Sequence, residues 1–153
     1  MGRLKTFALA ALAIASLAAA KAAPEDPSAV HQEVDIPLPA ARIYAALLDA
    51  KQFARITGSP AKIDGSAGGA FSLFGGAIGG RNVELVPDSM VVQAWRDNDW
   101  APGVYSMVRF KLTPQGSSTH LVLDQTGFPK GEFHSLTVGW PAHYWTPLKS
   151  LPR

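Results

Sequence analysis

The sequence predicts an α+β domain in which helices cover one side of an antiparallel sheet. Two observations support this class. Between Lys62 and Thr126, strand-like runs recur roughly every ten residues and turn-forming residues separate them, as in a meander. From Phe133 to Leu151, apolar residues recur at helical intervals, which predicts a terminal helix lying on the apolar face of that sheet.

The amino-terminal segment, residues 1–22, has the composition of a secretory signal peptide. A basic start at Arg3 and Lys5 precedes an apolar run of 14 residues, and residues 20–22 have the small-x-small form of a cleavage site. The run is shorter than the roughly 20 residues that a membrane-spanning helix needs. We therefore expect cleavage after Ala20 or Ala22, no stable membrane anchor afterwards, and export to the periplasm in a Gram-negative source or secretion otherwise.

Removal of this leader changes the charge balance. The chain has 14 Lys and Arg against 12 Asp and Glu, and the leader contains Arg3, Lys5 and Lys21, which leaves 11 basic against 12 acidic residues. A nearly neutral domain without runs of Lys or Arg does not supply the charge that neutralises phosphates, so nucleic acid is not an expected partner. Cysteine is absent, which excludes disulfides, thiolate metal sites and a thiol nucleophile.

The rest of the chain is predicted to form one domain, residues 30–153, behind a tether at residues 23–29. The tether is polar and contains Pro24 and Pro27. Apolar and polar residues then alternate from Val30 to Leu38, which predicts a half-buried strand, and Pro37 places it near a sheet edge or at a strand end.

Two short helices are expected after this strand. Pro39 can begin the first helix, whose apolar face extends from Ala40 to Leu48. Asp49 is placed to cap the second helix, and Gly58 followed by Pro60 is expected to end it.

The bends of the meander are marked by glycine, proline and short polar residues. Val108, Phe110 and Leu112 alternate with Arg109 and Lys111. Leu121 and Leu123 alternate with His120, Val122 and Asp124, so each strand has one inward set. The predicted bends are Gly75-Gly76, Gly79-Gly80, Pro87-Asp88-Ser89, residues 100–103 and residues 114–117.

The terminal helix has an aromatic-rich stripe that includes Trp140 and Tyr144, whereas Trp145 lies off that stripe. An interior proline removes a helical hydrogen bond and usually kinks the chain. We therefore expect Pro141 and Pro147 to bend the helix or to divide it into two pieces.

The order of these strands and bends resembles a known family. Glu84, Pro87, Trp95 and Arg96, residues 100–105, Gly139-Trp140 and Tyr144-Trp145 resemble the carboxy-terminal domain of activators of the heat-shock-protein-ninety ATPase, within the START-like (SRPBCC) helix-grip superfamily. The resemblance covers about residues 30–151. It implies a strongly curved sheet that grips the last helix, with a cavity between them in many relatives.

The residues expected to line such a cavity are mostly apolar. Gln125 continues the inward parity of its strand and would add one amide, although it could equally bond a loop at the strand end. Glu84 and Arg96 form a second polar pair by family position, either in the cavity or as an ordinary cross-strand salt bridge. The candidates are Phe71, Leu73, Leu85, Trp95, Val108, Phe110, Leu123, Gln125, Trp140 and Tyr144.

Motifs for catalysis or cofactor binding are absent from the sequence. The four histidines, His31, His120, His134 and His143, have no metal-ligand spacing, and the paired glycines do not follow a phosphate-binding pattern. No serine has a nucleophile-elbow setting. We therefore expect no metal, no cofactor and no catalytic residue. Trp100, in a predicted turn, is a candidate for contact with a protein partner.

Three functions remain open. The first is non-catalytic binding of a lipophilic small molecule or lipid between sheet and terminal helix, favoured by the apolar sheet face and the aromatic helix. The second, implied by the resemblance, is a module that contacts and regulates a chaperone ATPase. The third is a cyclase-type or hydrolase-type enzyme of the same superfamily. Such an enzyme needs an acid or base inside the cavity, and the inward-facing polar residues are Gln125 and perhaps Glu84 or His134.

Overall fold

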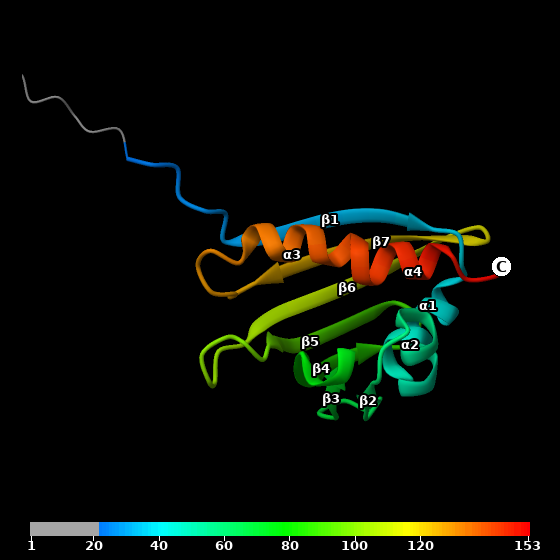
Figure 1. Cartoon of the computed structure of the whole chain (residues 1–153). Coiled ribbons are helices and arrows are strands. Elements are labelled where there is room, and N and C mark those ends of the chain that lie inside the picture. Colours follow the sequence, from blue (N-terminus) through cyan, green and yellow to red (C-terminus); the bar gives the residue numbers. More distant parts are fainter. Residues whose placement is uncertain (1–21) are drawn as a thin grey trace, which may run out of the picture.

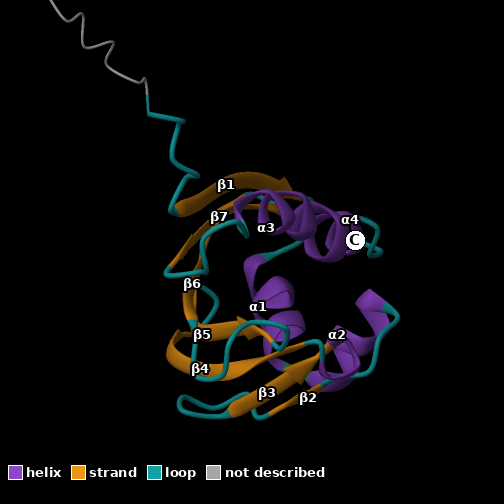
Figure 2. Ribbon diagram, turned by 60° about the vertical axis from the view of Figure 1, so that its left-hand side comes forward, coloured by secondary structure: helices purple, strands orange, loops and turns teal. Residues whose placement is uncertain are grey.

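Seven antiparallel strands form one open, curved sheet, and the helices lie inside its curve (Figure 1, Figure 2). The computed structural model describes residues 22–153. The strand order is β1-β7-β6-β5-β4-β3-β2, so β2 to β7 form the predicted meander and β1 joins its far edge. The strands are β1 (Ala29–Ile36), β2 (Lys62–Ile63), β3 (Ala70–Leu73), β4 (Ile78–Val86), β5 (Met90–Asp97), β6 (Ser106–Gln115) and β7 (Ser118–Thr126).

The first strand is an edge strand, as Pro37 predicts. Its inward residues are buried or half-buried and its outward residues are exposed. Residues 22–28 before it are exposed and form no helix or strand. The expected leader falls almost entirely outside the described residues, and its cleavage stays a prediction. Within residues 22–153, no helix is long and apolar enough to span a bilayer.

Both short helices are confirmed. Helix α1 (Ala40–Leu48) buries Ile43 and Leu47 toward the core. Helix α2 (Ala50–Thr57) begins where the Asp49 side chain accepts a hydrogen bond from the Gln52 backbone N–H, and it ends at Gly58 in the left-handed conformation (φ 70°).

Two predicted bends are wrong in detail. Gly79 and Gly80 lie inside β4, and a Cβ on Gly80 would come within 1.9 Å of the Ala94 carbonyl oxygen, so this glycine permits a close approach of strands. Pro114 and Gln115 belong to β6, and the hairpin turn is only Gly116-Ser117, with Gly116 at φ 61°.

The terminal helix is continuous, and the expectation of two separate pieces is wrong. Helix α3 (Phe133–Trp140) passes into a π-helical turn, η2 (Pro141–Trp145), and then into α4 (Thr146–Lys149). In the wide turn the Thr146 N–H donates to the Pro141 carbonyl, five residues earlier. This turn accommodates a residue without a backbone N–H and rotates both Tyr144 and Trp145 into the core.

Two glutamine–tryptophan pairs fasten this helix to the sheet. The Trp140 indole N–H donates to the Gln125 side chain of β7 at 2.8 Å, and the Trp145 indole donates to Gln32 of β1 at 2.7 Å. Gln32 also donates to the Thr137 carbonyl at 2.8 Å. The helix therefore lies over β1 and β7, as Figure 1 shows, instead of crossing the middle of the sheet.

Candidate functional site

A pocket opens between the terminal helix and the adjoining ends of β4 and β5. Its volume is about 460 Å³, and its walls come from α3 and η2, the end of α2, the short 3₁₀ turn η1 (Phe74–Gly76) and the adjoining ends of β4 and β5. Because the helix lies over β1 and β7, the distant strands β4 and β5 are left partly uncovered. The pocket is therefore a consequence of where the helix is fastened.

The floor of the pocket is aromatic. Trp140 lies 4.6 Å from Tyr144 and 5.6 Å from Trp95, measured between ring centroids, and Phe74 packs edge-on against Tyr144 at 5.9 Å. Pairs of this geometry are stabilising beyond the area that they bury. The floor is therefore a rigid, largely apolar surface.

The expected cavity residues divide into two groups. Trp95, Trp140 and Tyr144 line the pocket. The others do not: Leu85 is half-buried, and Phe71, Leu73, Val108, Phe110 and Leu123 are buried in the hydrophobic core. Residues that line the pocket and that the sequence did not indicate include Phe74, Ile78 and Leu136.

Gln125 is fully buried, and its amide is used inside the fold. Its Nε2 donates to the Ser106 hydroxyl at 3.0 Å, while its Oε1 accepts from Trp140. The Ser106 hydroxyl in turn donates to the Trp95 carbonyl at 2.8 Å. This chain of bonds holds the aromatic floor, so Gln125 positions pocket residues without lining the pocket.

Two floor residues carry buried polar atoms that lie next to each other. They are the Trp95 indole nitrogen Nε1 and the Tyr144 hydroxyl, and both atoms are buried. Burial raises the pKa of the Tyr144 hydroxyl far above its ordinary value, while a hydrogen bond from the Trp95 side chain lowers it by a smaller amount. Tyr144 is therefore a neutral donor at physiological pH.

The charged groups that line the pocket are acidic. They are Asp97, at the end of β5, and Glu132, just before α3, and His143 is the one lining side chain that can carry a positive charge. Arg96 is not a lining residue, because its guanidinium turns away to donate to the Trp100 and Ala101 carbonyls at 2.7 and 3.2 Å.

The comparisons with known proteins agree with this architecture. The sequence pattern of a family described as activator of Hsp90 ATPase homolog 1-like protein matches residues 37–152. The chain belongs to this family. It is 36% identical, over 107 residues, to an activator of 90 kDa heat shock protein ATPase homolog from Dictyostelium discoideum, which corresponds to 69% of the chain and 28% of the relative. A Mus musculus relative, the activator homolog 2, is 27% identical over 110 residues, 72% of the chain and 33% of the relative.

Solved structures of this family show the same fold. An HSP90 activator from Plasmodium falciparum superposes with a TM-score of 0.74 at 26% identity, covering 78% of this chain and 92% of that one. The Aha1 dimer from Colwellia psychrerythraea gives a TM-score of 0.69 at 15% identity, covering 80% and 95%, a likeness in fold alone. The helix-grip fold and the family resemblance are thus confirmed. The chain spans about a third or less of the curated relatives it matches.

The expectation for Glu84 and Arg96, which rests on family position, is wrong. Glu84 is exposed on β4 and pairs in register with Val92, while Arg96 pairs with Gly79, so the two side chains form neither a cavity pair nor a salt bridge. Trp100 is not an exposed turn residue. Its side chain is only 6% exposed and packs against Trp95 at 5.7 Å, so its ring is not available to a protein partner.

The polar residues considered for catalysis do not meet in the pocket. Gln125 is enclosed, and both Glu84 and His134 are exposed without lining it. The described residues 22–153 also contain no cluster of three His, Asp or Glu side chains suited to a metal ion.

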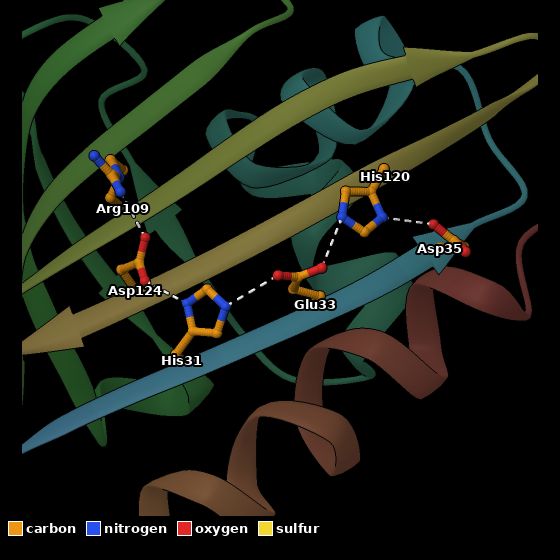
Figure 3. Close-up of polar contacts among 6 residues, drawn as sticks. All are labelled: His31, Glu33, Asp35, Arg109, His120 and Asp124. Carbon is orange, nitrogen blue, oxygen red and sulfur yellow. Dashed lines mark hydrogen bonds and ion pairs between the residues drawn. The ribbon is translucent and has the colours of Figure 1, made fainter.

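A charged network on the outer face of the sheet escaped the sequence analysis (Figure 3). His31 contacts Asp124 at 2.6 Å and Glu33 at 3.1 Å. Asp124 also contacts Arg109 at 2.6 Å. Further along the same strands, His120 contacts Asp35 at 2.7 Å. The antiparallel register places His31 opposite Asp124 and Asp35 opposite His120. Outward parity was readable from each strand, but the pairing of β1 with β7 was not.

Proposed function

We propose that this chain binds a lipophilic small molecule or lipid in the pocket between the terminal helix and β5. The observation that carries the proposal is the pocket of about 460 Å³ on an aromatic floor, a size and lining typical of small-ligand sites. Trp95, Trp140 and Tyr144 supply apolar contact area, and Leu136 and Ile78 extend it.

Hydrogen bonds hold the residues of the pocket floor in place. Trp140 is fixed by Gln125, and Trp95 is fixed through its carbonyl by Ser106. A preformed site loses little conformational entropy when a ligand enters. Binding without catalysis fits the predominantly apolar floor.

Native mass spectrometry of the protein isolated from its own source tests the proposal. We expect a stoichiometric adduct that is released on denaturation and identified as a lipophilic small molecule. An empty protein that also takes up nothing from a lipid extract of the same cells would contradict the proposal.

Regulation of a chaperone ATPase is the second candidate, because the named relatives are activators of the 90 kDa heat shock protein ATPase. The chain corresponds to only a third or less of those relatives, so the activity of the whole relative is a proposal here. Stimulation of a purified chaperone's ATPase rate by this protein would support it, and an unchanged rate at saturating protein would contradict it.

Export is the third element of the proposal and rests on the composition of residues 1–22. Amino-terminal sequencing of the protein from each cell fraction tests it. We expect an exported form that begins at Lys21 or Ala23, and an intact Met1 form confined to the cytoplasm would contradict it.

A further inference from the structure

Two carboxylates line the pocket, and they come from different elements. Asp97 lies at the end of β5 and Glu132 just before α3, and both residues are half-buried. Among the described residues, no Lys or Arg lines the pocket. Neither carboxylate belongs to an ion pair within residues 22–153. The pocket therefore carries two negative charges that the described chain does not pair.

Each of these carboxylates has one oxygen that accepts no hydrogen bond from the described chain. Asp97 Oδ1 accepts from the Asp99 backbone N–H at 2.9 Å, and Glu132 Oε2 accepts from the Ser135 hydroxyl at 2.9 Å. These short-range bonds orient the two side chains and leave Asp97 Oδ2 and Glu132 Oε1 free. A carboxylate forms its strongest hydrogen bonds with a positively charged donor, so the free oxygens are suited to an ammonium group.

The remainder of the lining is predominantly apolar. It includes Ile78, Leu136 and the half-buried ring of Phe74, beside the Trp95 and Trp140 rings of the floor. Apolar surface of this kind favours an apolar ligand body by burial. The face of an aromatic ring also attracts a cation. The apolar lining and the two carboxylates thus suit two different parts of one molecule.

We propose that the ligand of this pocket is an amphiphilic amine, whose protonated nitrogen contacts Asp97 and Glu132 while its apolar body lies on the aromatic floor. This inference rests on the proposed binding function and specifies the class of ligand.

The same charges discriminate against other lipophiles. A fatty-acid-like anion would meet two like charges, and the guanidinium of Arg96 is turned toward backbone carbonyls. A charge that leaves water needs a partner of opposite sign, which the pocket does not offer to an anion through any Lys or Arg of the described chain. A neutral hydrocarbon would occupy the floor but would leave both carboxylates without a countercharge.

Three probes with one ring system test this class on the full chain. They are the amine 2-(2-aminoethyl)naphthalene, its near-isosteric hydrocarbon 2-propylnaphthalene, and the anion 2-naphthylacetate, each measured by equilibrium dialysis. At pH 8 the amine is protonated and a histidine side chain is ordinarily neutral, so His143 does not oppose the cation. Burial alone favours the hydrocarbon. We nevertheless expect the amine to bind about fivefold more tightly, and the anion to bind most weakly.

Asp97→Asn and Glu132→Gln remove the charges and keep an acceptor for the local hydrogen bonds. Each variant should lower the affinity for the amine about threefold, and the double variant should prefer the hydrocarbon, whose own affinity stays unchanged. Glu84→Gln, at an exposed position of β4 that does not line the pocket, is the matched control and should leave all three affinities unchanged. Rising ionic strength should weaken binding of the amine in the wild type, because salt screens partly exposed charges, and should not weaken binding of the hydrocarbon.

The outcomes separate the two levels of the proposal. Equal or tighter binding of the hydrocarbon by the wild type overturns the inference and leaves lipophile binding in place. An amine preference that the double variant retains, or that salt does not reduce, overturns the roles of Asp97 and Glu132. Tightest binding of 2-naphthylacetate overturns the cationic class. Failure of all three probes to bind overturns the inference together with the proposed pocket function.

Discussion

The indole nitrogen of Trp140 lies 2.8 Å from the side-chain oxygen of Gln125, to which it donates a buried hydrogen bond. The other end of the same amide donates to Ser106, whose hydroxyl donates to the Trp95 carbonyl. One amide thus connects the terminal helix, β7, β6 and β5. It sets the relative position of two residues of the pocket floor.

Replacing Gln125 with leucine should therefore destabilise the fold. The change leaves the buried Trp140 N–H without its acceptor, at a cost of about 1–3 kcal/mol in the free energy of unfolding. Urea denaturation followed by tryptophan fluorescence measures it. Gln115→Leu, at an exposed position of β6, is the control and should stay within about 0.5 kcal/mol of the wild type. An equal effect of both variants would mean that the Gln125 network does not stabilise the fold.

Gly80 should tolerate no side chain, whereas its neighbour Gly79 should accept alanine. A Cβ on Gly80 would lie 1.9 Å from the Ala94 carbonyl oxygen and 2.5 Å from the Phe71 ring, while the nearest contact of one on Gly79 is 3.6 Å. We expect Gly80→Ala to cost about 1–3 kcal/mol or more, as overpacking does, and Gly79→Ala to cost less. Thermal unfolding of the two variants decides this, and similar Tm values would contradict the close approach.

A bulky residue at Gly139 should close the pocket without unfolding the protein. Gly139 lies on α3, lines the pocket, and would place a Cβ no nearer than 3.9 Å to any neighbour, the His143 side chain. We expect Gly139→Trp to lower the affinity for a lipophilic probe at least tenfold. Its Tm should stay near that of the wild type, since leaving glycine also favours the helix.

Val138→Trp is the matched control for the closed pocket. Val138 is the preceding residue of α3, is 52% exposed and does not line the pocket. It should leave probe affinity unchanged. Unaltered binding in Gly139→Trp would place the ligand elsewhere.

The outer histidines should make stability depend on pH. Hydrogen bonds raise the pKa of His31 above 6.5, chiefly through Asp124, and raise that of His120, chiefly through Asp35. When folding raises a pKa, the protonated form stabilises the fold. This stabilisation is complete at a pH below the ordinary histidine pKa of 6.5 and is lost as the pH rises through the pKa of the folded protein. The double variant His31→Gln/His120→Gln should therefore lose less stability than the wild type between pH 6 and pH 9.

The acidic partners set the lower limit of the pH range in which these contacts stabilise the fold. The same hydrogen bonds lower the pKa of Glu33 and Asp124, so their contribution is present above the ordinary carboxyl range and is lost as the pH falls. Tm measured at intervals of one pH unit tests both the loss of stability at high pH and the loss at low pH. His134→Gln, at an exposed position of α3 outside the ion pairs among the described residues, is the control. Parallel Tm curves for the double variant and the wild type would contradict the prediction.

Much of the fold was readable from local patterns. Alternation identified β1, β6 and β7, Asp49 and Gly58 marked the limits of α2, and the spacing of apolar residues identified the terminal helix. These signals are local because a strand or helix exposes its faces at a fixed period. The π turn at Pro141 was not readable, because a proline alone does not reveal how the surrounding backbone accommodates it.

The sequence by itself determined the class of fold, the family and the inward set of each strand, because each depends on residues close together in the chain. Tertiary structure alone decided that Gln125 accepts the hydrogen bond of Trp140 and that His31 forms an ion pair with Asp124. It also decided that the pocket opens beside Trp95 and Tyr144. The physical reason is that these relationships depend on strand register and on where the helix is fastened. Both are set by contacts between residues far apart in sequence.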